Sequence, residues 1–134
     1  MCVFIDANIL FSAAYKDASR LRALWDIPGV SLVTSERALI EARRNLLRSH
    51  PNREAALEDL ASCLEIVGEP SAHQDLPIQV KLPPGDLAIL ASAIQSRSDI
   101  LLTGDAKHFG HLYGSNVGGV VVMRARSFIA QTSG

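Results

Sequence analysis

The candidate catalytic residues of this sequence are four acids, Asp6, Glu41, Asp86 and Asp105. Asp6 directly follows the apolar run at 3–5, and Asp105 follows a second predicted strand at 100–103. Continuous apolar runs are typical of strands that are buried on both faces of a parallel sheet. Because open α/β sheets bind their ligands outside the carboxyl ends of such strands, we expect both carboxylates to meet at that edge.

Each acid taken alone has a simpler structural interpretation. Asp6 could cap the helix that follows it, and Asp86 could stabilise the first turn of a helix that begins near residue 85. Glu41 lies beside the apolar stripe of a predicted helix at 35–49, where Arg37 and Arg44 are at helical spacing. Such pairs each contribute roughly 0.2–0.5 kcal/mol. The four acids together favour a functional site over four separate structural roles.

A cluster of carboxylates indicates a particular chemistry. Neighbouring carboxylates repel one another and raise one another's pKa, and a hard divalent cation relieves that repulsion. Carboxylates without a Cys or His ligand set favour Mg²⁺ or Mn²⁺ over Zn²⁺. Such a site activates water and holds a phosphate oxygen, as phosphodiester hydrolysis requires. The sequence has no GxxxxGK phosphate loop, GxSxG elbow or HExxH motif that would indicate another chemistry.

The four histidines, His50, His73, His108 and His111, do not form a recognisable ligand set. Only His108 and His111 are close in sequence, and the predicted turn that holds them offers no third partner. The sequence therefore favours the interpretation in which neither of them contacts a metal or the substrate.

Strands alternate with helices along the chain, which predicts crossover connections and a mostly parallel sheet covered on both faces. Strands are predicted at 3–5, 31–34, 66–67, 99–103 and 120–123, and helices at 8–15, 17–27, 35–49, 52–64, 85–96 and around 128–129. Irregular segments are predicted at 68–84 and in the glycine-rich stretch 110–119. The expected fold is a single three-layer α/β/α sandwich domain that spans residues 1–134.

Composition is that of a globular protein, with 48% apolar and 20% charged residues among 134. Cys2 and Cys63 are expected to be small buried residues in a reducing compartment. No apolar run approaches the length of a membrane span, and a strand that starts at residue 2 leaves no room for a signal peptide. We therefore expect a soluble, cytoplasmic protein.

The net charge of −1 argues against a bulk nucleic-acid binder. If a metal neutralises four of the 14 acidic residues, however, the formal charge of the remainder is +3. A weakly basic surface around an acidic site is therefore compatible with the composition.

Four motifs in order give the chain a family resemblance. They are FIDANIL at 4–10, SERALIE at 35–41, GDLAILASA at 85–93 and LLTGD at 101–105. This set, which spans nearly the whole chain, resembles the PIN domain family and most closely its small VapC-type toxins. The resemblance implies that the acids matching Asp6, Glu41, Asp86 and Asp105 bind Mg²⁺ or Mn²⁺ in an endoribonuclease.

The resemblance also implies roles for other residues. Asn8 would support the site by hydrogen bonds, and Thr103 would orient the last acid. In-line attack of a metal-activated water would leave a 5′-phosphate and a 3′-hydroxyl. The chain departs from the family at Ala7, where a hydroxyl residue is common, and in its long segment at 68–84. The cations that could hold RNA phosphates are Arg37, Arg44, Arg48 and Lys107.

The partners implied by the resemblance are an RNA substrate, an antitoxin protein whose peptide can occupy the groove, and a second copy of the chain in a homodimer. Three alternatives stay open. A haloacid-dehalogenase-like phosphatase would need a second acid two residues after the nucleophile, where this chain has Asn8, and Lys81 is a poor match for its lysine. A PIN-type fold could bind RNA or protein without cutting. A receiver-like signalling domain would need paired acids after the first strand.

Overall fold

The computed structural model describes residues 1–69 and 80–132. In these residues six strands form one sheet, in the order β3-β2-β1-β4-β6-β5. The strands are β1 (Cys2–Ile5), β2 (Ser31–Ser35), β3 (Glu65–Val67), β4 (Ile100–Leu102), β5 (Asn116–Val117) and β6 (Val120–Met123). Every neighbouring pair is parallel except β5 and β6. The predicted mostly parallel sheet is confirmed.

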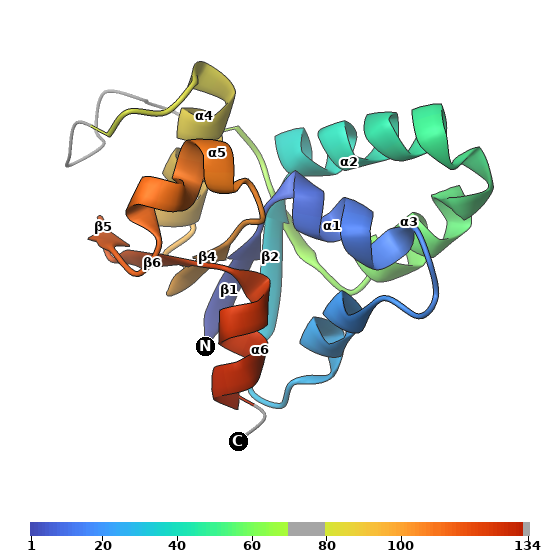
Figure 1. Cartoon of the computed structure of the whole chain (residues 1–134), viewed down its shortest axis with the longest axis horizontal. Coiled ribbons are helices and arrows are strands. Elements are labelled where there is room, and N and C mark those ends of the chain that lie inside the picture. Colours follow the sequence, from blue (N-terminus) through green and yellow to red (C-terminus); the bar gives the residue numbers. More distant parts are fainter. Residues whose placement is uncertain (70–79, 133–134) are drawn as a thin grey trace.

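Helices cover both faces of this sheet (Figure 1). The α-helices are α1 (Ala7–Ala14), α2 (Glu36–Ser49), α3 (Glu54–Ala61), α4 (Pro84–Gln95), α5 (Ala106–Phe109) and α6 (Ala125–Thr132). Helices α1, α2 and α3 lie together on one side, and α4 and α5 lie on the other (Figure 1). The three-layer α/β/α architecture is therefore confirmed. None of the described helices is both long and apolar enough to cross a membrane.

The two strands that carry the site are at the centre of the core. Val3, Phe4 and Ile5 of β1 are completely buried, as are Leu101 and Leu102 of β4. Strand β1 lies between β2 and β4, with Ile5 opposite Leu102. The ends of β1 and β4 are thus held by neighbours on both sides, which fixes the positions of the residues that follow them.

Helix α2 forms as its sequence pattern predicts. The hydroxyl of Ser35 accepts a hydrogen bond from the Ala38 backbone N–H at 3.1 Å, which caps the first turn. The predicted apolar stripe is buried, and its members are Ala38, Leu39, Ala42 and Leu46. Because this stripe faces the core, Glu41 is on the exposed side of the helix.

Several local predictions were wrong. The helix predicted at 17–27 is a shorter 3₁₀ helix at Arg20–Asp26. The apolar spacing does not distinguish the two helix types, because residues three apart share a face in both. The helix predicted at 52–64 is shorter, because Pro51–Arg53 form a 3₁₀ turn and α3 begins at Glu54. Cys63 is exposed and Cys2 is only partly buried. Helix α3 ends at Ala61, so Cys63 lies beyond its buried face.

The glycine-rich stretch is more ordered than predicted, because it contains β5. Gly118 and Gly119 have φ angles of +60° and +94° and form the two-residue turn between β5 and β6. Such hairpin turns need positive φ at both positions, which glycine adopts without steric cost. Of the predicted irregular segment at 68–84, residues 70–79 with His73 lie outside the described residues.

Candidate functional site

Two of the four predicted acids follow adjacent parallel strands, as the topology requires. Asp6 comes directly after β1 and is the N-cap of α1. Asp105 follows β4 by three residues and is the N-cap of α5. Asp6 therefore also has the capping role that the simpler interpretation gave it, and Asp105 has one that the sequence analysis did not consider. The chain places them at the carboxyl edge of the sheet and uses them to begin the next helix.

Asp6 is the buried member of the group, with only 4% of its surface exposed. One oxygen, Oδ1, accepts a hydrogen bond from the Ala7 N–H at 2.7 Å, and Oδ2 accepts one from the Thr103 hydroxyl at 2.9 Å. Burial raises the pKa of Asp6 from 3.8 to about 6, and the carboxylates of Glu41 and Asp86 act in the same direction. The structure therefore holds a carboxylate whose negative charge is poorly compensated.

Thr103 and Asn8 connect the ends of β1 and β4. The hydroxyl of Thr103 donates to Asp6 and accepts from the backbone N–H of Asp105 at 3.1 Å. The Asn8 amide oxygen accepts from the Gly104 N–H at 2.8 Å. A Cβ at Gly104 would lie 3.3 Å from that oxygen, so the missing side chain lets the two loops approach closely. These contacts fix Asp6 and Asp105 relative to each other.

The other acids open onto one pocket of about 540 Å³. Glu41 reaches it from α2, Asp86 from the first turn of α4, and Asp105 from the start of α5. Pro84 is the first residue of α4, which is the helical position where proline is best tolerated, and it places Asp86 in the first turn. Asp6 does not line the pocket, but Glu41 and Asp86 influence its pKa. Electrostatic effects thus link Asp6 to Glu41 and Asp86, and Asp86 to Asp105.

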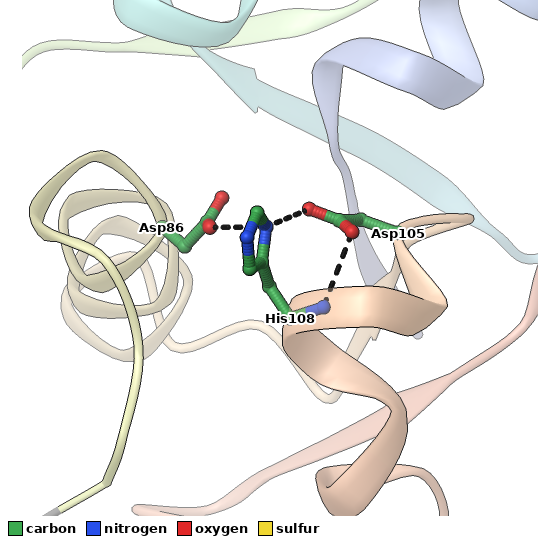
Figure 2. A group of neighbouring side chains, drawn as sticks. All are labelled: Asp86, Asp105 and His108. Atoms are coloured by element: carbon green, nitrogen blue, oxygen red, sulfur yellow. Dashed lines mark hydrogen bonds and ion pairs between the residues drawn. The ribbon is translucent and has the colours of Figure 1, made fainter.

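Asp86 and Asp105 face each other across His108 (Figure 2). The His108 ring nitrogen Nδ1 lies 2.7 Å from Asp105 Oδ2 and 3.2 Å from Asp86 Oδ2. Burial raises the pKa of Asp86, the Asp105 charge adds to that rise, and His108 opposes it. The prediction that His108 has no further partner was wrong, since helix α4, which is distant in sequence, supplies one. His111 is exposed on the next turn.

The predicted cations are divided between the pocket and the surface around it. Arg37 and Arg44 line the pocket, whereas Arg48 and Lys107 are exposed and do not line it. Arg37 already donates to both oxygens of Glu69, at 2.9 and 3.3 Å. Within residues 1–69 and 80–132, no lysine or arginine forms an ion pair with any of the four acids.

The donor set fits a divalent cation. Glu41, Asp86 and Asp105 offer carboxylate oxygens around an open pocket, and the buried charge of Asp6 is close by. Such hard oxygen donors are those that Mg²⁺ and Mn²⁺ bind. Because no lysine or arginine in the described part of the chain neutralises these acids, a bound cation would supply the missing charge.

The sequence analysis set one residue beside the acids aside and did not consider another. His108 could have been found from its spacing, because a residue three positions after an N-cap lies beside that cap. Tyr113, whose hydroxyl donates to the Thr103 carbonyl oxygen at 2.9 Å, has no comparable signal in the sequence. Its contact depends on the path of the chain after α5.

No curated protein matches the sequence. Among solved structures, VapBC2 from Rickettsia felis bound to a promoter DNA fragment has a TM-score of 0.71 and 19% identity, over 92% of this chain and 98% of that chain. VapBC-1 from nontypeable Haemophilus influenzae has a TM-score of 0.59 and 19% identity, over 94% and 99%.

A third solved structure is VapC20 from Mycobacterium tuberculosis, described as a sarcin-ricin loop cleaving toxin. Its TM-score is 0.57 at 15% identity, over 78% of this chain and 92% of that chain. At these identities the three structures show a shared fold. A family model described as PIN domain matches residues 2–107. Since that match covers most of the sequence, the chain belongs to the PIN domain family.

Proposed function

We propose that this protein is a metal-dependent endoribonuclease that hydrolyses RNA phosphodiester bonds and acts as the toxin of a toxin–antitoxin pair. The observation that carries the proposal is that Glu41, Asp86 and Asp105 line one pocket from separate elements, with the buried carboxylate of Asp6 close enough for Glu41 and Asp86 to raise its pKa. A structural role for each acid alone does not explain why all four share a site without a compensating lysine or arginine among the described residues.

The residues of the site would hold Mg²⁺ or Mn²⁺ through the carboxylates of Glu41, Asp86 and Asp105, together with Asp6. A bound divalent ion lowers the pKa of a water molecule and stabilises the charge that develops on a phosphate. The protein's part is to fix the carboxylates before substrate arrives. Thr103 does this for two of them, because its one hydroxyl contacts both the Asp6 carboxylate and the Asp105 backbone. Asn8 does it by joining the two loops.

RNA is the substrate that the surroundings of the pocket favour. Arg44 and Arg37 line the same pocket as the acids. Arg37 could bind a phosphate if it released Glu69. Guanidinium groups bind phosphate oxygens and so position a nucleic-acid backbone. Arg48 and Lys107 would contact more distant phosphates. One protein of similar fold is described as cleaving the sarcin-ricin loop, which supports RNA as the substrate class.

The partners follow from the same comparisons. Two of the similar structures are VapBC complexes, and we propose that this chain likewise binds a cognate antitoxin. A homodimer stays a prediction from the family resemblance. The family match removes the phosphatase and receiver interpretations, since it accounts for all four motifs. A non-catalytic binding role is the alternative that the following experiment decides.

The test is cleavage of end-labelled single-stranded RNA with Mg²⁺ or Mn²⁺, with and without EDTA. Wild type is compared with Asp86→Asn, which removes one charge at the pocket and keeps the side-chain shape. Asp59→Asn is the matched control, because Asp59 is an exposed acid on α3 that does not line the pocket. We expect metal-dependent cutting by wild type and Asp59→Asn, and a loss of at least about 100-fold in Asp86→Asn.

Equal cutting by wild type and Asp86→Asn would show that the activity does not come from this site. If wild type binds RNA and leaves it intact with either metal, the non-catalytic alternative is correct instead.

A further inference from the structure

The imidazole of His108 occupies the space between two of the four acids (Figure 2). The same ring nitrogen, Nδ1, faces Oδ2 of both Asp86 and Asp105, at 3.2 and 2.7 Å. One suitable atom from each of these three residues lies within 4.8 Å of the other two. A nitrogen donor is therefore built into a site that the sequence presents as carboxylate only.

The distances between these atoms are those expected for ligands of one shared ion. Two ligand atoms that bind one ion at right angles, each about 2.1 Å from it, are about 3 Å apart. Both separations from Nδ1 are close to that value. A small movement of the side chains would let the nitrogen and both carboxylates bind a single cation.

The backbone fixes this arrangement. The N–H of His108 donates to Asp105 Oδ1 at 3.2 Å, so the turn of α5 that begins at Asp105 also holds the base of the imidazole. Asp86 approaches from α4 on the other side of the ring. The His108 side chain is 37% exposed, which leaves the pocket side of the ring accessible.

We propose that His108 is a nitrogen ligand of the metal centre, and that it makes the site prefer a divalent first-row transition-metal ion to Mg²⁺. The inference rests on the proposed function, because it concerns the same centre. Its physical basis is that imidazole suits transition-metal ions, whereas Mg²⁺ favours carboxylate, carbonyl and water oxygens.

The competing role for His108 is that of a positively charged partner which separates the two carboxylates until a metal displaces it. The two roles predict different effects of His108→Ala on the affinities for Mn²⁺ and Mg²⁺. Loss of a ligand weakens Mn²⁺ binding more than Mg²⁺ binding. Loss of a competing positive charge strengthens the binding of both ions, or leaves the ratio of their affinities unchanged.

The experiment uses Mn²⁺ as a paramagnetic probe of the full-length protein. Electron spin-echo modulation detects a directly bound ¹⁴N nucleus, and calorimetry gives Kd for Mn²⁺ and Mg²⁺. We expect a ¹⁴N signal in wild type and in His111→Ala, the matched control, and none in His108→Ala. The Mn²⁺ affinity of His108→Ala should fall by about tenfold or more, with a much smaller change for Mg²⁺.

A wild-type protein that binds Mn²⁺ without a ¹⁴N signal would overturn the inference, and that result does not depend on how any variant folds. Equal changes in Mn²⁺ and Mg²⁺ affinity in His108→Ala would overturn it as well. RNA cleavage measured on the same samples separates the two proposals, since cleavage without a nitrogen ligand leaves the nuclease proposal standing. Absence of both metal binding and cleavage in wild type would remove both proposals.

Discussion

At the scale of single residues, the buried charge of Asp6 lowers the stability of the folded protein. Its carboxylate is nearly inaccessible to water, and within the described residues it has no ion pair with a lysine or arginine. Hydrogen bonds from Ala7 and Thr103 compensate part of the cost of burying the charge. The raised pKa of about 6 indicates that they do not compensate all of it. The buried charge of Asp6 therefore lowers the stability of the metal-free protein, and a cation bound as proposed would offset that loss.

Asp6→Asn should therefore stabilise the metal-free protein at neutral pH. The pKa of Asp6 is raised from 3.8 to about 6, so the folded state favours the protonated form. The stabilisation linked to that proton is complete below about pH 4 and is lost as the pH rises through about 6, at a cost of about 3 kcal/mol. An asparagine does not titrate, so the variant should lack this loss and be more stable at pH 7.

Urea unfolding in EDTA at several values between pH 4 and pH 7 measures this difference. Asp59→Asn, at an exposed position, should follow wild type across the range. If wild type and Asp6→Asn lose the same free energy of unfolding between pH 4 and pH 6, Asp6 is not the destabilising group. Metal added at pH 7 should stabilise wild type and have a smaller effect on Asp6→Asn.

At the scale of single elements, helix N-termini place three of the four acids. Asp6 and Asp105 are N-caps, and Asp86 lies in the first turn of α4. Local signals made these positions predictable, since apolar runs mark the strands and Pro84 marks a helix start. Glu41 was placed on its helix by the 3.6-residue period of α2. The contact of His108 with Asp86 was not predictable, because it depends on how α5 packs beside α4.

The backbone conformation at the end of α4 was not predictable from local patterns. Arg97 has a φ of +57°, the left-handed conformation that usually belongs to glycine after a helix. The Ser98 N–H donates to the Ala93 carbonyl oxygen at 3.0 Å, a bond typical of that helix ending. The sequence pattern placed the end of this helix and the start of the next strand correctly, but an arginine gives no signal for the left-handed turn between them.

Arg97→Gly should raise the free energy of unfolding by about 0.5–1 kcal/mol, because glycine adopts this conformation without steric strain. The measurement is the midpoint of urea unfolding, with an unchanged slope of the free energy of unfolding against urea concentration. Arg126→Gly removes the same charge from within α6, where glycine should instead lower stability by up to about 1 kcal/mol. A fall in stability for Arg97→Gly would show that the arginine side chain contributes more than the strain costs.

At the scale of the whole molecule, the sheet topology gathers the site and the charge distribution decides what can approach it. Parallel strands β1 and β4 end side by side, while α2 and α4 reach the same edge from opposite faces of the sheet (Figure 1). The net charge of −1 hides an uneven distribution, since Arg37 and Arg44 share a pocket with four acids, Glu69 included. RNA binding should therefore depend on a few arginines at the pocket rather than on overall charge.

The salt dependence of RNA binding separates the contribution of the pocket arginines from that of the overall charge. Each phosphate contact to single-stranded nucleic acid contributes about 0.7 to the slope of log K against log salt concentration. Arg44→Ala should lower that slope by about this amount in EDTA, where the proposed metal-dependent cleavage is not expected. Arg43→Ala is the matched control, because this neighbouring arginine pairs with Glu58 at 2.8 Å and does not line the pocket. Its slope should equal that of wild type.

Arg37→Ala should have a smaller effect than Arg44→Ala, because Arg37 must first leave Glu69. Glu69→Gln, which weakens that pairing, should tighten RNA binding and increase the slope. The binding constants come from fluorescence anisotropy with a labelled single-stranded RNA across a salt series. Equal losses for Arg43→Ala and Arg44→Ala would mean that RNA responds to the total charge of α2, and the pocket would then have no special part in binding the backbone.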